Sequence, residues 1–329
     1  ATPTSTPHSQ PTPATPELFS SPESTRHRRR KTPGWINNHA WRLGEKIGSG
    51  SFGEVYQGLN DRGKLFAAKR MNVSMGMEGE HEGVQELLGE ILLMRGLSHP
   101  HIVGYIGAWL DEDQEQLYIF QEWVPGGSLS HLLKHFGAFA LGMVREYTRQ
   151  ICLGLAYLHE NGIIHRDVKA SNILVDAHRT VKLADFGAST RVTDFDKSQD
   201  IMQSQESVKG TPYFMAPEVL AAGKYGRKGD VWAVGCTMIQ MLTGQPPWKE
   251  LNLKGLVQLH VHLACWEGGP PLPPLTRAQV TPEAMGCLDM CFQKVETHRP
   301  LVPELLSCAF LMQQEEPDSD SDSSEGGRR

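Results

Sequence analysis

The sequence lacks the long apolar stretch that a membrane span needs. A transmembrane helix takes about 20 consecutive apolar residues, but the most apolar stretch, residues 231–242, is interrupted by Gly235, Thr237 and Gln240. The amino terminus is polar and rich in proline, which is not typical of a secretory signal peptide. We therefore expect no membrane span and interpret residues 231–242 as a buried helix. The first residue is not methionine, which is typical of a processed chain or of a fragment.

Cysteine and basic residues are also too scarce for some classes of protein. The 329 residues include 6 cysteines, whose spacing matches neither a disulfide framework nor a zinc site. We expect reduced cysteines in a cytoplasmic protein, with a nuclear location as the alternative. The formal net charge of −6 provides no basic field, so we expect no nucleic-acid partner. The dense basic run at residues 26–31 is interpreted as solvated rather than as a localisation signal or docking patch.

Composition divides the chain into a central globular region and two tails. Residues 1–40 are rich in proline, serine and threonine, and residues 314–329 form an acidic serine tract. We expect both tails to be disordered, because they carry too little apolar surface to offset the entropy lost on ordering. Residues 41–313 have the apolar content and the periodic patterns of one folded domain.

The pattern within this domain changes from strands to helices. Residues 41–120 read mainly as strands with turn signals between them, and residues 82–97 have apolar side chains at helical spacing. A Pro-Gly-Gly segment lies in the connector, residues 121–127. Residues 128–313 are mainly helical, and we expect helices at residues 129–136, 141–160, 228–243 and 282–293. The sequence predicts an α+β fold with two lobes: a small β-rich N-lobe with one helix and a larger helical C-lobe.

A glycine-rich turn occurs early in the domain. Gly48, Gly50 and Gly53 follow the pattern G-x-G-x-x-G, which lets a backbone approach phosphate groups without interference from side chains. In dinucleotide-binding folds such a turn opens a helix. Here residues 54–59 read as a strand, which favours a flap over nucleotide phosphates.

Lys69 lies in an apolar strand, where an unpaired ammonium group would be costly. It therefore needs anions as partners. We expect the phosphates of a nucleotide to be one partner and a carboxylate from the next helix to be the other. Glu90 is our choice for that carboxylate, and Glu86, one helical turn earlier, is the alternative.

The most specific pattern runs from residue 165 to residue 187. Asp167 is placed to accept the proton of a substrate hydroxyl, and Lys169 to neutralise charge on a transferring phosphoryl group. Asn172 and Asp185 offer the oxygen ligands that Mg²⁺ prefers. Residues that merely cap helices would not explain this lysine together with a second aspartate in Asp-Phe-Gly.

Arg166, beside this aspartate, predicts control by phosphorylation. A phosphate on the segment 185–218 would supply the anion that its guanidinium lacks. Ser207 and Ser204 are the favoured switch sites. Thr211 is a further candidate, although we expect it to stay unmodified and to hydrogen-bond to Asp167 and Lys169.

Together these motifs resemble the signature set of eukaryotic protein kinases, in the same order. Lys169 after His-Arg-Asp is typical of serine/threonine kinases. Several segments further resemble the mitogen-activated protein kinase kinase kinases. These segments are residues 136–139, 147–150, 154–159, 185–189, 210–218 and 246–248. One difference is Phe214, where that group usually has tryptophan.

The resemblance implies roles for further residues. Glu218 and Arg299 would form a buried ion pair, and Asp230 would anchor the backbone of the catalytic loop. Val55 and Ala67 would cover the adenine and Leu174 would lie beneath it. The full set that it implies for ATP binding is Ile47, Gly48, Gly50, Gly53, Val55, Ala67, Lys69, Glu90, Gln121, Glu122, Val124 and Leu174.

The resemblance implies an ATP- and Mg²⁺-dependent serine/threonine protein kinase. Its substrate would be a mitogen-activated protein kinase kinase, phosphorylated on its activation loop, and an upstream kinase or autophosphorylation in trans would activate it. Three alternatives stay open: a catalytically weak pseudokinase scaffold, a small-molecule kinase, and a serine/threonine kinase of the sterile-20-like group. A pseudokinase would need a damaged catalytic residue, and Lys69, Asp167, Asn172 and Asp185 are all present.

Overall fold

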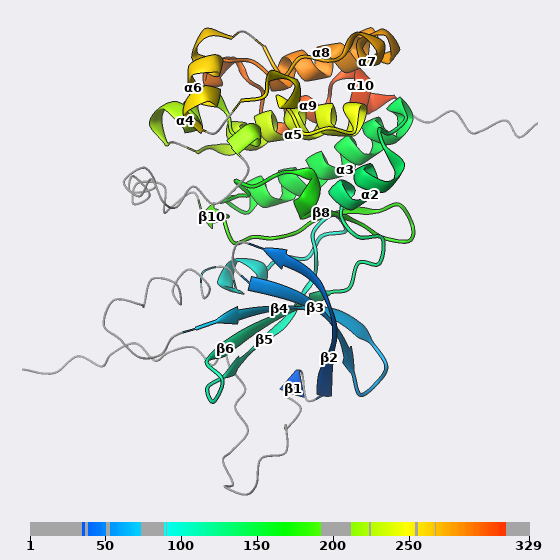
Figure 1. Cartoon of the computed structure of the whole chain (residues 1–329), viewed down its shortest axis with the longest axis vertical. Helices are drawn as coiled ribbons and strands as arrows, with labels where there is room; N and C mark the ends of the chain where they lie inside the picture. The colour runs from blue at the N-terminus through cyan, green and yellow to red at the C-terminus, as the bar shows by residue number, and fades with distance from the viewer. Residues whose placement is uncertain are drawn as a thin grey trace, which may run out of the picture. The chain divides into compact units, whose positions relative to one another are not determined.

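The computed structural model describes most of the chain between Trp35 and Gln313 (Figure 1). The described residues are 35–36, 39–50, 53–73, 89, 91–191, 212–223, 225–253, 256–266 and 268–313. Contacts divide the chain into two compact units, one formed by residues 1–80 and 106–121, the other by residues 81–105 and 122–329. The first unit is built on a sheet and the second mainly from helices, which confirms the predicted α+β fold class.

The sheet has the strand order β1-β2-β3-β4-β6-β5. Its strands are β1 (Trp35–Ile36), β2 (His39–Gly50), β3 (Gly53–Asn60), β4 (Leu65–Asn72), β5 (Tyr105–Asp111) and β6 (Gln116–Glu122). Strands β1 to β4 pair antiparallel with their neighbours. The β3–β4 turn forms because the Asn60 side chain accepts hydrogen bonds from the backbone N–H groups of Arg62 and Lys64, at 3.1 and 2.8 Å.

One cluster of aromatic side chains forms the core of the sheet unit. Phe66 and Ala68 of β4 are buried with Trp41, Tyr118 and Phe120. The rings of Trp41 and Phe120 lie edge to face with centroids 4.9 Å apart, which is a favourable arrangement for aromatic pairs. This packing fixes which face of β4 is buried.

The helical unit contains short strands and a set of packed helices. The strands are β7 (Ile163–Ile164), β8 (Ile173–Val175), β9 (Val181–Leu183) and β10 (Thr190–Arg191), paired β7 with β10 and β8 with β9. The helices are α2 (Leu129–Phe136), α3 (Leu141–Glu160), α4 (Pro217–Ala222), α5 (Arg227–Thr243), α6 (Leu256–Cys265), α7 (Pro274–Gln279), α8 (Pro282–Cys291), α9 (Val302–Leu306) and α10 (Ala309–Met312).

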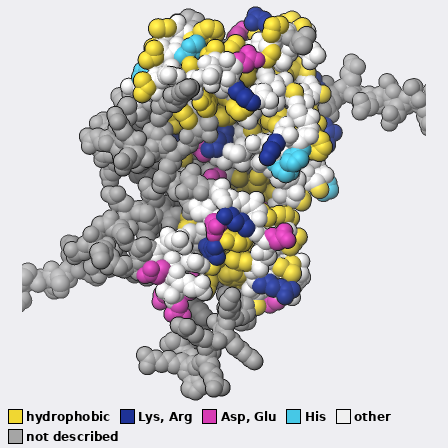
Figure 2. Space-filling view, in the orientation of Figure 1, with side chains coloured by type: hydrophobic (Ala, Val, Ile, Leu, Met, Phe, Trp, Pro, Cys, Tyr) yellow, Lys and Arg dark blue, Asp and Glu magenta, His cyan; other side chains and the backbone are white. Residues whose placement is uncertain are grey.

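Helix α5 lies at the centre of the helical unit. Every residue from Gly229 to Leu242 is buried, so the helix is surrounded by protein on all sides, and α3 and α8 pack against it. The prediction of a buried helix at residues 231–242 is confirmed. Among the described helices, none combines the length and the apolar character needed to cross a membrane. On the face shown in Figure 2, acidic and basic side chains are interspersed.

Candidate active site

The glycine turn joins β2 to β3 in the sheet unit. Gly53 has a φ of +145°, and a Cβ atom there would lie 2.1 Å from the carbonyl oxygen of Arg70, so only glycine fits. Ile47, just before the turn, exposes 47% of its apolar side chain. Gly53 therefore lies close to the backbone of β4, and the exposed Ile47 side chain is free to contact a ligand.

Lys69 and Ala67 lie on the face of β4 opposite to the aromatic core. Side chains alternate along a strand, and the neighbouring Phe66 and Ala68 point into that core. In the β3–β4 ladder Val55 pairs with Lys69, and directly paired residues share a face. The lysine is buried, with 7% of its side chain exposed. Three of the residues predicted to contact ATP are thus placed together on one face of the sheet.

A charged network that was not predicted from the sequence stabilises this sheet next to the glycine turn. The Glu54 carboxylate accepts hydrogen bonds from Lys46, Arg70 and Tyr56 at 2.6, 2.5 and 2.8 Å. Hydrogen bonds from Lys46 first, then from Arg70 and Tyr56, lower the pKa of Glu54 to about 2. These residues come from β2, β3 and β4, so the network ties three strands together where the turn begins.

The catalytic loop of the helical unit follows β7. The Lys169 ammonium donates to both oxygens of Asp167, at 2.9 and 2.7 Å. The side-chain amide of Asn172 donates to the Asp167 carboxylate at 2.7 Å and to its backbone carbonyl at 3.0 Å. Three residues that the sequence predicted to act together therefore form one hydrogen-bonded cluster.

Asp230 of α5 holds the backbone of this loop. Its carboxylate is fully buried and accepts hydrogen bonds from the N–H groups of His165 and Arg166, at 3.0 and 2.9 Å. It also contacts Nε2 of His159 at 2.8 Å. Arg166 has a φ of +67°, which is unfavourable for a residue with a side chain. The buried carboxylate holds the chain in this conformation and so fixes the start of the loop.

Asp185 follows the β8–β9 hairpin and lies beside the loop. The N–H of Ala184 donates to the carbonyl oxygen of Asn172 at 2.9 Å, which brings the two predicted metal ligands together. Asp185 has a φ of +62°, and the next residue, Phe186, is buried against His165 with ring centroids 5.3 Å apart. Packing of Phe186 thus fixes the point at which the chain turns and presents Asp185.

The connector predicted at residues 121–127 includes Glu122, the last residue of β6. Its carboxylate accepts a hydrogen bond from the N–H of Gly104 at 3.0 Å and forms an ion pair with Lys182 of β9 at 3.1 Å. Further along, Val124 packs with Val103, Ala184 and the partly buried Leu174. The sequence predicted backbone contacts for this segment, but the side-chain role of Glu122 was missed, because its partners are distant in the chain.

Comparison with known families identifies the domain. The family described as "Protein kinase domain" matches residues 41–311. The chain belongs to the protein kinase domain family. The kinase domain is 42% identical over 275 residues to "Mitogen-activated protein kinase kinase kinase 3" of Arabidopsis thaliana, an alignment that covers 82% of this chain and 40% of that protein.

Two further relatives come from distant organisms. "Mitogen-activated protein kinase kinase kinase A" of Dictyostelium discoideum is 40% identical over 283 residues, covering 84% of the chain and 28% of the relative. "Mitogen-activated protein kinase kinase kinase 3" of Homo sapiens is 40% identical over 271 residues, covering 82% of the chain and 42% of the relative. The chain matches 40% of the length of the first relatives.

A buried ion pair joins two distant parts of the helical unit of this kinase domain. The Arg299 guanidinium is fully buried and donates to the two carboxylate oxygens of Glu218, at 2.7 and 3.1 Å. It also donates twice to the carbonyl oxygen of Gln293 and once to that of Lys228. Its face stacks on Trp232, with the guanidinium carbon 5.1 Å from the ring centroid. All five N–H donors of the arginine are satisfied, so the pair is an integral part of the fold.

Some predicted site residues of the kinase domain lie outside the described residues. These are Glu90, Ser204, Ser207 and Thr211. The pairing of Lys69 with Glu90 and the choice of a phosphorylation site therefore stay predictions. Gln121 is half-buried at the end of β6.

Proposed function

We propose that this domain transfers the terminal phosphoryl group of ATP to serine or threonine hydroxyls of a protein. One arrangement carries the proposal: the Asp167 carboxylate is held by hydrogen bonds from Lys169 and Asn172, beside Asp185. The family match covers the whole of this cluster. A pseudokinase scaffold is not favoured, because none of the groups needed for transfer is replaced.

Asp167 would orient the substrate hydroxyl and accept its proton. An ionised carboxylate has about four lone-pair sites, and three of them receive hydrogen bonds from Lys169 and Asn172. One acceptor site is left, and the fixed orientation of the carboxylate aims it. Lys169 keeps a positive charge within reach of the transferring group, where negative charge develops.

Asn172 and Asp185 would hold Mg²⁺. The amide nitrogen of Asn172 is turned toward Asp167 by two hydrogen bonds. Its amide oxygen accepts one long hydrogen bond from the Ser171 hydroxyl, at 3.3 Å, and keeps a second lone pair for a cation. Among the described residues, no cluster of three or more His, Cys, Asp or Glu side chains forms a complete metal cage. This suits Mg²⁺, which commonly takes one or two protein oxygens and completes its shell with phosphates and water. Bound Mg²⁺ would neutralise charge on the phosphate oxygens during transfer.

Further groups would bind the nucleotide. The buried ammonium of Lys69 and the open backbone at Gly48 suit phosphate groups. Among the described residues, the N–H of Val124 donates to no backbone carbonyl, which leaves it for an adenine nitrogen. Leu174, packed against Val124, would form the apolar surface below the ring.

The narrower proposal is that the substrate is a mitogen-activated protein kinase kinase. The proposal is supported by the names of the relatives, each of which is called a mitogen-activated protein kinase kinase kinase. Control by phosphorylation is supported by Arg166. Burial lowers the pKa of this guanidinium, and its buried Nε atom has no hydrogen-bond partner among the described residues. A phosphate on the segment that precedes residue 212 would supply the missing anion.

A transfer assay tests both levels of the proposal. The protein is incubated with Mg²⁺, radiolabelled ATP and a catalytically inactive mitogen-activated protein kinase kinase, and the labelled amino acids are identified. We expect label on serine or threonine, a strong loss with Asp185→Asn, and loss of substrate labelling when its activation-loop hydroxyls are replaced by alanine. Label on a generic protein but not on this substrate would contradict only the narrower proposal. Equal labelling by wild type and Asp185→Asn would contradict the enzymatic function itself.

A further inference from the structure

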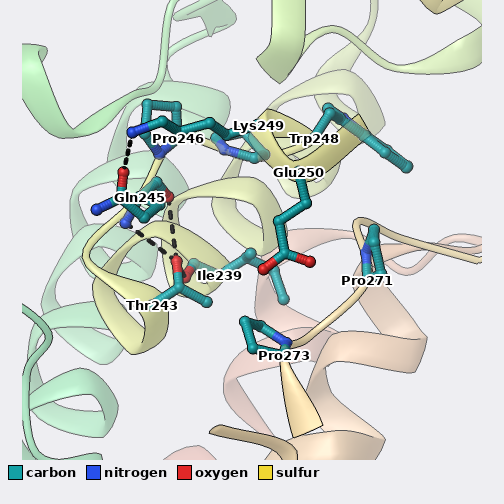
Figure 3. A pocket seen from close by; sticks show the side chains of 10 residues that line it. Ile239, Thr243, Gln245, Pro246, Trp248, Lys249, Glu250, Pro271 and Pro273 are labelled. Atoms are coloured by element: carbon teal, nitrogen blue, oxygen red, sulfur yellow. Dashed lines mark hydrogen bonds between the residues drawn. The ribbon is translucent and has the colours of Figure 1, made fainter. Parts of the chain in front are cut away.

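A pocket of about 310 Å³ lies in the helical unit, far in sequence from the catalytic loop (Figure 3). It is formed at the carboxyl end of α5, by the segment that follows this helix, and by the chain before α7. Its apolar walls come from Ile239, from Trp248 and from four prolines, at positions 246, 247, 271 and 273. The volume is at the lower limit of ligand pockets in proteins. It offers room for one side chain of a partner rather than for a folded element.

Most polar groups at this pocket are already used by the protein. The Thr243 hydroxyl donates to the carbonyl oxygen of Ile239 at 2.8 Å and accepts a hydrogen bond from the N–H of Gln245 at 3.1 Å. The Lys249 ammonium donates to the side-chain oxygen of Gln245. Figure 3 shows this lysine directed toward Gln245 and away from Glu250. The Lys249 ammonium group therefore points toward Gln245 and away from the Glu250 carboxylate.

Glu250 is the acidic group of the pocket. Figure 3 shows its carboxylate pointing into the space between Ile239, Pro271 and Pro273. Among the described residues, this carboxylate makes no hydrogen bond and no ion pair. Among the described residues, the pocket thus combines apolar walls with one carboxylate whose oxygen atoms receive no hydrogen bond.

We propose that this pocket binds an arginine side chain from an extended segment of a partner protein. The aliphatic stem would pack on the proline and isoleucine walls, as stems of long basic side chains do on apolar surfaces. The guanidinium would donate two parallel hydrogen bonds to Glu250. Arginine suits the site better than lysine, because its head group is weakly hydrated and its planar fork of donors matches a carboxylate.

Paired peptides test this assignment on the full chain. The probes are acetyl-Ala-Ala-Arg-Ala-Ala-amide and the same peptide with citrulline, which keeps the shape of arginine but has no charge. Binding is followed by the methyl signal of Ile239 in NMR titrations. We expect the arginine peptide to bind about tenfold more tightly than the citrulline peptide, which corresponds to about 1.4 kcal/mol.

Three variants connect the binding to the carboxylate. Glu250→Gln should remove the difference between the two peptides, and Glu250→Lys should instead favour a peptide with glutamate at the central position. Glu160→Gln, which neutralises an exposed glutamate at the end of α3, is the matched control and should leave the difference unchanged. Phosphoryl transfer to a generic protein should be the same in all three, so this proposal and the proposed function fail separately.

The outcomes distinguish the possible occupants. Equal binding of the two peptides to wild type, or an unchanged difference in Glu250→Gln, would overturn the proposal. A loss with Glu160→Gln as well would show only general attraction between charges and would also overturn it. The basic run at residues 26–31 is a rival occupant. If arginine-selective binding appears only after the arginines of this run are replaced by glutamine, the chain's own segment fills the pocket and the claim of a partner protein is wrong.

Discussion

Replacing Arg299 by methionine should destabilise the domain strongly. The guanidinium is fully buried and makes five hydrogen bonds, two of them to Glu218. Methionine has a similar volume but no donor. The substitution would leave the half-buried Glu218 carboxylate and two backbone carbonyls without their partner.

The magnitude follows from the loss of one partner of a buried pair. Such a loss costs about 3–5 kcal/mol, a large part of the roughly 5–15 kcal/mol that stabilises a typical domain. For domains of this size class each kcal/mol lowers Tm by about 2–4 °C. We therefore expect Tm to fall by roughly 6–20 °C.

Thermal unfolding followed by circular dichroism measures this effect. Arg149→Met, which removes an exposed arginine from α3, is the control and should change Tm by less than about 2 °C. Arg299→Lys should also destabilise the domain, because lysine cannot reproduce the fork to the carboxylate. A melting curve for Arg299→Met that matches the control would refute the claim that this pair holds the helical unit together.

Three further predictions concern the site. Asp230→Asn should lower kcat and reduce the free energy of unfolding by about 1–3 kcal/mol, because asparagine offers fewer acceptors to His165 and Arg166. A kcat equal to that of wild type would show that the loop keeps its conformation without the carboxylate. Lys69→Met should reduce the rate of phosphoryl transfer by about 10²-fold or more. Tm should stay within a few degrees of wild type, since an apolar side chain of similar length replaces a buried charge. Retained phosphoryl transfer would contradict the role given to this lysine. Ser207→Ala should lower the activity of a phosphorylated preparation, and unchanged activity would shift the switch to Ser204.

Local signals in the sequence were sufficient to locate the long helices. The predicted helices at residues 129–136 and 141–160 match α2 and α3 in full. Helix α2 begins where Ser128 accepts a hydrogen bond from the N–H of His131 and ends at Gly137, whose φ is +77°. Such caps involve residues close in sequence, so they can be recognised without the fold.

Contacts between distant residues could not be predicted in the same way. The Glu54 network and the pair between Glu122 and Lys182 depend on strand register and on packing, which the charges alone do not encode. Helix α6 was also missed as a separate element. It carries no Asp, Glu, Lys or Arg, and so it lacks the charged face that would have distinguished a helix at the surface.

The residues of the catalytic loop were predicted because their roles are fixed by chemistry and by spacing. Asp167, Lys169 and Asn172 were predicted to act together, and the structure places Lys169 and Asn172 in hydrogen-bond contact with Asp167. The use of the Asn172 amide nitrogen as a donor to the aspartate was not predicted. This orientation depends on the 3-10 turn at Ala170–Asn172, whose geometry is set by tertiary contacts.

The rate of phosphoryl transfer in a single turnover, at saturating ATP and Mg²⁺, tests the central claim most directly. The comparison is between wild type and Asp167→Asn, with nucleotide affinity measured in parallel. If Asp167 accepts the proton of the attacking hydroxyl, the rate should fall by about 10²–10⁴-fold while the affinity for ATP changes little. A variant that transfers the phosphoryl group as fast as wild type would contradict the account.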